Sequence, residues 1–298
     1  MTFVLSLISA PDAAELTPAA LDRANRGLSA VGAVAQPVRW LDPERAAEIP
    51  FAGDDAAALA EIRRRLVDSP VDINVLPIAG RRKKLLVSDM DATAIIGETL
   101  DELSNFTPHK AEIDNLTRQS VNGLMSFADT LVARIALMRG LPEEAFARTW
   151  DKIEAMPGMK VAVATMRANG AYTALVSGCF SYFTSRVRGM LGFDCDVANS
   201  LELLDGRLTG RIPPPLIDPA GKVAALRRLT AERNLTTDET LAVGDGSNDI
   251  PMLQAAGLGI AFRGKPKVKQ AIPIWLDHAG PTGLLYLQGY SRGEFVES

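Results

Sequence analysis

Two aspartates one residue apart, Asp89 and Asp91, are the strongest sign of chemistry in the sequence. They follow the short apolar run 85–87, which predicts a buried strand of a parallel sheet. Ligands of such sheets bind beyond the carboxyl ends of the strands, and strand periodicity points both carboxylates the same way. Two like charges this close repel, so one tends to protonate unless a cation lies between them. The pair therefore predicts either a divalent metal site or two carboxylates that share a proton.

Further polar residues stand at the ends of other expected strands or at the start of an expected helix: Ser177, Lys222, Asp245, Asn248 and Asp249. If they converge with the aspartate pair, the site holds carboxylates, a hydroxyl and a cation. Oxygen ligands without His or Cys suit a hard cation, so Mg²⁺ is the first choice, and Mg²⁺ commonly bridges to phosphate. Ser177, its neighbouring backbone N–H groups and Lys222 would then supply donors for phosphoryl oxygens.

Such a set of groups suits hydrolysis of a phosphate monoester, a reaction that enzymes accelerate by up to ~10²¹-fold. Positioning and charge neutralisation carry most of that acceleration. A carboxylate nucleophile divides the reaction into two steps through an aspartyl-phosphate. A neighbouring acid can protonate the leaving oxygen and then deprotonate the attacking water.

The segments that carry these groups alternate strands with helices, which predicts a doubly wound, Rossmann-like parallel-sheet α/β core. Strands are expected at 85–87, 172–176, 240–243, 258–262 and 272–276, with a helix from about residue 221. Segments 196–203 and 207–211 flank Asp205-Gly206, a strong hairpin signal. The helical stretch between about 98 and 156 is longer than a strand crossover needs, so we expect a helical cap inserted over the strand ends.

Residues 1–80 are expected to form a separate small domain, and residues 81–298 the catalytic one. Strands at 3–8, 34–41 and 71–75 alternate with helices capped by Thr17 and Asp54, and this order suggests an α/β sandwich of the ferredoxin type. Pro37 suggests that the second strand lies at an edge. The basic segment 79–83 is interpreted as the linker.

The overall composition narrows the class of protein. A chain of 298 residues with 47% hydrophobic residues can bury a sizeable core. A net charge of −4 gives no reason to expect nucleic acid or an anionic membrane as a partner. Cys179 and Cys195 form no disulfide framework, so a cytoplasmic location is the default. The apolar N-terminus is short and is interpreted as a strand rather than a signal peptide.

The ordered motifs as a whole resemble the haloacid dehalogenase superfamily of phosphatases and, more narrowly, the phosphoserine phosphatase family. The matching segments, which lie between about Leu85 and Phe262, are Asp89-Met-Asp-Ala-Thr with Glu98 and Asp101-Glu102, Val176-Ser-Gly-Cys-Phe180, and Gly244-Asp-Gly-Ser-Asn-Asp-Ile-Pro-Met252. The resemblance implies Mg²⁺-dependent conversion of O-phospho-L-serine to L-serine and phosphate, the last step of serine biosynthesis.

The resemblance also implies a role for each motif residue. Asp89 would be the nucleophile and Asp91 the general acid/base. The phosphoryl group would be bound by Ser177, Gly178, Lys222 and Asn248. Mg²⁺ would be held by Asp89, the backbone carbonyl of Asp91, Asp245 and, through water, Asp249.

In the cap, the resemblance implies that Glu98 meets the substrate ammonium, Arg134 its carboxylate, and that Phe127 closes the pocket. A phosphorylated zwitterion needs one anion and one cation away from its phosphate, and an arginine fork suits a carboxylate. The sequence departs from the family pattern at Ala92, where serine is frequent, at Cys179, where a second glycine is usual, and at Val121, where methionine often stands.

Two other functions stay open at the level of sequence. One is the same chemistry on another small phosphate ester, or phosphoryl transfer to an alcohol such as homoserine. The other is a serine-responsive regulatory protein, because the N-terminal segment resembles amino-acid-binding ACT-type modules. Such modules often pair, so a homodimer is the protein partner to test for.

Overall fold

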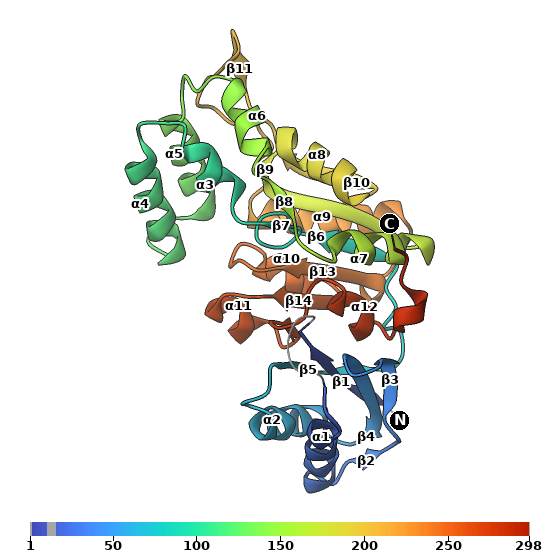
Figure 1. Ribbon diagram of the computed structural model, residues 1–298. Coiled ribbons are helices and arrows are strands. Elements are labelled where there is room, and N and C mark those ends of the chain that lie inside the picture. Colours follow the sequence, from blue (N-terminus) through green and yellow to red (C-terminus); the bar gives the residue numbers. More distant parts are fainter. Residues whose placement is uncertain (1, 11–15, 298) are drawn as a thin grey trace.

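The structure is a computed structural model that describes residues 2–10 and 16–297. Figure 1 shows a small sheet with two helices at the bottom, a larger α/β body in the middle, and a group of helices at the upper left. The small N-terminal unit and the helical insertion therefore lie at opposite ends of the molecule. No helix within the described ranges is both long and apolar enough to cross a membrane.

The body is built on a parallel sheet of six strands, in the order β10-β9-β6-β13-β14-β15. The strands are β6 (Leu85–Ser88), β9 (Tyr172–Phe180), β10 (Cys195–Asn199), β13 (Thr240–Gly244), β14 (Leu258–Phe262) and β15 (Trp275–Leu276). The predicted parallel α/β core is confirmed. The strand order reverses direction between β6 and β13, and in open α/β sheets ligands bind at such a switch point.

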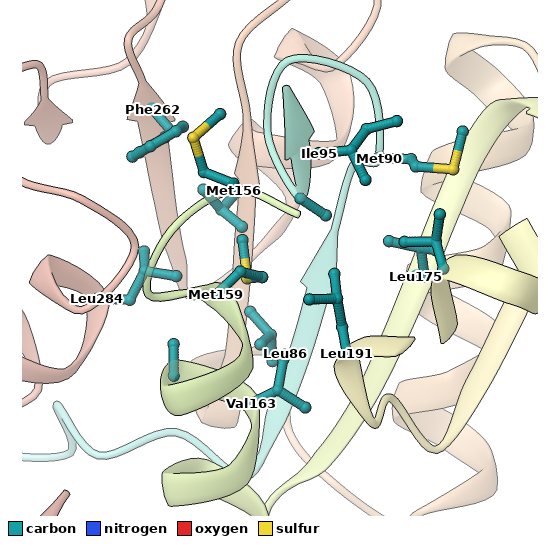
Figure 2. Close-up of a cluster of buried hydrophobic side chains, with 14 of the residues drawn as sticks. Leu86, Met90, Ile95, Met156, Met159, Val163, Leu175, Leu191, Phe262 and Leu284 are labelled. Atoms are coloured by element: carbon teal, nitrogen blue, oxygen red, sulfur yellow. The ribbon is translucent and has the colours of Figure 1, made fainter. Parts of the chain in front are cut away.

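Helices cover both faces of this sheet. One face carries α7 (Met159–Ala168), α8 (Ser181–Leu191) and α12 (Gly283–Leu287); the other carries α9 (Pro219–Glu232), α10 (Ile250–Ala255) and α11 (Pro266–Ala271). Figure 2 shows part of the first layer, where Met159 and Val163 of α7 pack against Leu86 of β6. The 3₁₀ turns η1 (Thr237–Glu239) and η2 (Arg292–Glu294) complete the body. Because both faces are covered, the strands read as continuous apolar runs rather than as alternating patterns.

The expected helical insertion is present between β6 and α7. It contains α3 (Thr99–Ser104), α4 (Lys110–Val121), α5 (Phe127–Leu137) and α6 (Glu144–Trp150). The strand β7 (Ile95–Ile96) at its entrance pairs antiparallel with β8 (Glu154–Ala155) at its exit. This two-stranded stem brings both ends of the insertion back to the carboxyl end of β6, so the helices form a cap beside the sheet.

Two strand predictions in the body need correction. The hairpin at Asp205-Gly206 exists, but its strands β11 (Leu203–Leu204) and β12 (Arg207–Leu208) are far shorter than expected. The first half of the segment predicted as its first arm, residues 196–199, belongs to β10, which runs parallel to β9 in the main sheet. The predicted strand 272–276 is reduced to β15, because Ile272 follows directly on α11 as its C-cap.

The N-terminal unit has five strands and two helices. Its elements are β1 (Phe3–Ser9), α1 (Pro18–Ala30), β2 (Val34–Ala35), β3 (Arg39–Asp42), β4 (Ala46–Ala52), α2 (Asp55–Arg65) and β5 (Val71–Pro77). The antiparallel sheet runs β2-β4-β1-β5, and β3 also pairs with β4. Thr17 and Asp54 cap the two helices as expected, each accepting a backbone N–H of the first turn.

The prediction of one strand over 34–41 was wrong, and β4 was not anticipated. The expected strand is divided into β2 and β3 around Pro37, and both pieces pair with β4. Pro50 is unfavourable in a central strand, because proline has no N–H to donate to a ladder. In the structure, Pro50 lies opposite the break between β2 and β3, where only its carbonyl is used, by the N–H of Gln36.

The N-terminal sheet is buried on both faces. Residues such as Leu5 and Ile49 pack on α1 and α2, whereas Val4 and Ile8 join the core of the body. Asp72 on β5, only 4% exposed, accepts the backbone N–H groups of the three residues that follow β15, Asp277, His278 and Ala279. The N-terminal unit is therefore fixed to the edge of the main sheet by buried polar contacts.

Candidate active site

A cavity of about 390 Å³ lies between the carboxyl ends of the body strands and the cap. Most of the predicted site residues line it, namely Asp89, Asp91, Glu98, Phe127, Arg134, Ser177, Gly178, Asp245 and Asn248. The other two, Lys222 and Asp249, are buried. Lys222 donates to both Asp89 and Asp249, and so connects Asp249 to the residues that line the cavity. The structure thus brings together every residue that the sequence singled out, from segments up to 160 positions apart: Asp89 to Asp249.

The pairing of β6 with β13 places the two central carboxylates side by side. Ser88 is in register with Val243, and the N–H of Asp89 donates to the carbonyl of Val243 at 2.9 Å. Asp89 and Asp245 are the first residues after β6 and β13, respectively. Both emerge at the switch point of the sheet, where a ligand can contact both strands at once.

Lys222 neutralises the carboxylates beneath the cavity. Its side chain is 1% exposed, and its Nζ donates to Asp89 Oδ1 and to Asp249 Oδ1, each at 2.6 Å. Asp218 holds the start of α9 by accepting the N–H of Gly221 at 2.8 Å, which fixes where Lys222 begins. Burial opposes the charge on Lys222, but the attraction of Asp249 and Asp89 outweighs it, so its pKa lies above its usual value.

Asp249 is fully buried, and a glycine makes room for it. Its Oδ2 accepts the N–H of Gly246 at 3.0 Å. A Cβ atom at Gly244 would lie 2.6 Å from the carboxyl carbon of Asp249, closer than any real contact. Glycine at the end of β13 is therefore required for this carboxylate to reach Lys222 and the cavity.

Three carboxylates are arranged to hold a cation. One oxygen each from Asp89, Asp245 and Asp249 lies within 4.8 Å of the other two, and all three groups are buried. Burial and then the charge of Asp249 hold the pKa of Asp89 well above its usual range, despite Lys222; burial likewise raises the pKa of Asp245. Crowded anions with only oxygen donors fit a hard divalent cation, which would relieve their repulsion.

Asp91 connects the body to the cap rather than joining these three side chains. Its Oδ1 accepts the N–H of Thr99 at 2.8 Å and the hydroxyl of Thr99 at 2.5 Å, at the start of α3. Burial raises the pKa of Asp91, although the hydrogen bonds from Thr99 favour its charged form. A raised pKa suits a group that must carry a proton at neutral pH.

Phe127 lies directly over Gly178, which together with Ser177 is expected to bind the phosphoryl group near the end of β9. A Cβ atom on Gly178 would be 2.7 Å from the Phe127 ring, so only glycine allows this approach. Ser177 is 1% exposed, and its hydroxyl accepts the N–H of Cys179 at 3.0 Å. Cys179 is 3% exposed and belongs to the buried apolar cluster, but it also lines the cavity beside Ser177 and Gly178.

Among the described residues, the charged cap side chains Arg134 and Glu98 have one ion-pair partner each, whereas Lys222 has two. Arg134 donates to Asp101 Oδ1 at 2.5 Å, while its buried Nε has no hydrogen-bond partner. Glu98 Oε1 lies 3.7 Å from the Nζ of Lys265, and its side chain is 47% exposed. Burial of its carboxyl, and then the charge of Asp91, raise the pKa of Glu98. The cap thus presents an anion and a cation to the same cavity.

Three residues near the site were not assigned a role from sequence: Thr99, Asp101 and Lys265. Lys265 follows β14 by three residues, and its Nζ lies 3.3 Å from Asp245 Oδ2. The rule that ligands bind at carboxyl ends of strands could have indicated it, because β14 is next to β13. The contacts of Thr99 and Asp101 depend on how α3 folds back, and the sequence carries no signal for that.

Fold and cavity together place a cluster of buried carboxylates at the switch point of a parallel sheet, under a helical cap. The profile of the haloacid dehalogenase-like hydrolases matches residues 86–254. The chain belongs to this family.

Among its curated relatives, the phosphoserine phosphatase of Archaeoglobus fulgidus is 38% identical over 231 residues, 76% of this chain and 67% of the relative. The phosphoserine phosphatase of Mycobacterium tuberculosis is 36% identical over 217 residues, 73% of this chain. That relative is much longer, and the match spans 53% of its length. A solved structure of a haloacid dehalogenase family hydrolase from Salmonella enterica superposes with a TM-score of 0.80 at 25% identity, covering 96% of this chain and 98% of that one.

Proposed function

We propose that this protein is a Mg²⁺-dependent phosphoserine phosphatase, which hydrolyses O-phospho-L-serine to L-serine and phosphate. The observation that carries the proposal is the composition of one cavity. Asp89, Ser177 and Lys222 are gathered for a phosphoryl group, and Glu98 and Arg134 face the same space from the cap. The names of the curated relatives support the same substrate.

The phosphoryl group would lie against Asp89, between Ser177 and Asn248. In the first step an oxygen of Asp89 attacks phosphorus while the ester bond to the serine oxygen breaks, and Asp91 gives that oxygen its proton. In the second step Asp91 takes a proton from water, the water oxygen attacks phosphorus, and the bond to Asp89 breaks. Lys222, already within 2.6 Å of Asp89, neutralises charge that gathers on the phosphoryl oxygens.

The proposed metal ligands are Asp89, Asp245 and Asp249, with the backbone carbonyl of Asp91. Bound Mg²⁺ would neutralise negative charge between the nucleophile and the phosphoryl oxygens. The all-oxygen donor set and the raised pKa values of Asp89 and Asp245 support this assignment.

The cap residues would select the substrate. Arg134 is 12% exposed and has a buried Nε without a partner, so a substrate carboxylate could satisfy it at little cost. Glu98 supplies the anion that an ammonium group needs. Phe127, over Gly178, would close the phosphoryl end of the pocket.

We further propose that residues 1–80 are an ACT-like domain and residues 81–298 the phosphatase domain, with its cap at about 98–156. The antiparallel order β2-β4-β1-β5 with α1 and α2 on one face supports the first assignment. A cytoplasmic location is proposed because both cysteines are free thiols.

The proposal is tested by phosphate release from a panel of phosphorylated amino acids and sugars, with Mg²⁺ and with a chelator. We expect O-phospho-L-serine to be the preferred substrate and the chelator to lower the rate by on the order of 10³-fold. Preference for a sugar phosphate, or an unchanged rate in chelator, would contradict it. Adding homoserine separates hydrolysis from transfer, because a transferase would form phosphohomoserine in place of free phosphate.

A further inference from the structure

Lys265 connects the body to the cap across the cavity. Its Nζ lies 3.3 Å from Asp245 Oδ2, at the end of β13, and 3.7 Å from Glu98 Oε1, at the start of α3. The backbone of Lys265 is held in place, because its N–H donates to the carbonyl of Asp245 at 3.1 Å. The base of the side chain is therefore held by the body, while its ammonium group reaches the cap.

The surrounding charges explain why a cation is needed at this point. Glu98 shares the cavity with Asp91 and Asp245, and the negative charges of both disfavour its charged form. Within residues 2–10 and 16–297, Lys265 is the one side-chain cation at ion-pair distance from Glu98. Without it, repulsion would drive the Glu98 carboxylate out of the cavity toward the solvent that its half-exposed side chain already meets.

We propose that Lys265 is a positioning residue, which holds the Glu98 carboxylate over the cavity where it can receive the ammonium group of an amino-acid phosphate ester. This inference rests on the proposed function. Lys265 lies beside Glu98 rather than in a close hydrogen bond with it, so the carboxylate retains acceptor positions for the substrate. The residue thereby contributes to selection of the ammonium group without contacting the reacting atoms.

The test compares two ligands of the same site in Lys265→Met. One ligand is O-phospho-L-serine, and its KM should depend on how well the site binds its ammonium group. The other is inorganic phosphate, which has no ammonium group, so its inhibition constant should not depend on Glu98. Both are measured by release of serine. We expect KM to rise roughly five- to tenfold, which corresponds to about 1 to 1.4 kcal/mol, with the phosphate inhibition constant and kcat within about twofold.

Two matched variants serve as controls. Lys265→Arg keeps the charge and should retain most of the wild-type KM. Lys269→Met removes a lysine of α11 that pairs with Asp277 at 2.7 Å and does not line the cavity, so it should leave KM unchanged. These controls separate an effect of the Lys265 charge from a general disturbance of α11.

The decisive measurement is a double-mutant cycle with Glu98→Gln. If Lys265 acts through Glu98, Lys265→Met should raise KM no further when Glu98→Gln is already present. Additive effects, or equal rises in KM and in the phosphate inhibition constant, would overturn the inference and indicate action through Asp245. A wild-type protein that releases no serine would instead refute the proposed function, a result that these variants cannot mimic.

Discussion

The floor of the cavity (Asp89, Lys222, Asp245 and Asp249) and its roof (Glu98, Asp101, Phe127 and Arg134) differ in how firmly their charges are held. On the floor, Lys222 and Asp249 are at most 1% exposed, and Lys222 makes two 2.6 Å contacts. On the roof, Asp101 is 41% and Glu98 47% exposed, and the ion-pair partner of Glu98 lies 3.7 Å away. Arg134 is the exception, because it is 12% exposed and lies 2.5 Å from Asp101.

This contrast follows from the free energy of burying charge. A buried ion costs several kcal/mol unless it is closely paired, so the floor tolerates little change in geometry. Half-exposed ion pairs contribute only ~0–1 kcal/mol, so a substrate can displace or share them. In the proposed mechanism, phosphoryl chemistry therefore takes place on a rigid surface and substrate selection on an adaptable one.

The largest expected effect is on the floor, from Asp89→Asn. Asparagine keeps the shape but is a poor nucleophile, so kcat should fall by ~10⁴-fold or more. The fold should survive, because burial and Asp249 already disfavour the charged form of Asp89. Single-turnover assays and thermal melting check both points. A variant with more than about a tenth of the wild-type rate would show that Asp89 is not the nucleophile.

Lys222→Met should affect stability as well as activity. It leaves the buried carboxylates of Asp89 and Asp249 without their cation, so the free energy of unfolding should fall by about 3 kcal/mol. Mg²⁺ should restore part of this loss, since it would neutralise the same carboxylates. Urea denaturation with and without Mg²⁺ measures both effects.

The exposed pair of Lys84 with Glu239 offers a control, because Lys84→Met should lower the free energy of unfolding by under ~1 kcal/mol. Equal losses in the two variants would remove the distinction between floor and surface.

On the roof, Arg134→Met should act on one class of substrate only. The KM of phosphoserine should rise roughly 10- to 100-fold, since a buried guanidinium partner for the carboxylate is lost. The KM of p-nitrophenyl phosphate, which has no carboxylate, should change less than about threefold. Steady-state kinetics on the two esters check this. If both KM values rise equally, Arg134 supports the cap rather than reading the substrate.

The smallest effect is expected from Phe127→Ala, which should raise the KM of phosphoserine about fivefold. Phe127 is packed against Gly178, so removal of its ring should also make room for a larger residue there. Gly178→Ala should therefore be less harmful in the Phe127→Ala background than alone. KM values for the two single variants and the double variant test this; simple additivity would mean that the ring does not close over Gly178 in solution.

The sequence predicted the floor better than the roof for a physical reason. Asp89, Ser177 and Asp245 follow apolar strands, and parallel strands must bring their carboxyl ends to one edge. The cap contacts have no such rule. The sequence did not predict that Arg134 donates to Asp101, because helix periodicity alone does not determine the distance at which α3 and α5 meet.

The errors in the N-terminal strands have one cause: contacts with neighbouring segments, which local sequence patterns do not show, decide how these residues are placed. No strand was predicted over residues 46–52, where Pro50 is unfavourable inside a ladder; in the structure, the break between β2 and β3 removes the need for its N–H. Strand alternation would place Asp72 and Asn74 of β5 on the side opposite its apolar residues, where solvent is the simple expectation; both are instead buried against the body. Alternation of polar and apolar residues indicates two faces, but it does not show that both are covered.

The contacts of Asp72 and Asn74 make the two sheets mutually dependent. The side chain of Asn74 hydrogen-bonds both the N–H and the carbonyl of Trp275, as a neighbouring strand would. The Asp72 carboxylate accepts the N–H groups of residues 277, 278 and 279. A shortened chain that starts at residue 81 would bare this flank of β15 and the ring of Trp275, which Arg63 covers at 3.8 Å, and an open edge of this kind favours aggregation. Grafting a different N-terminal module onto this hydrolase would therefore require an equivalent anion at the position of Asp72.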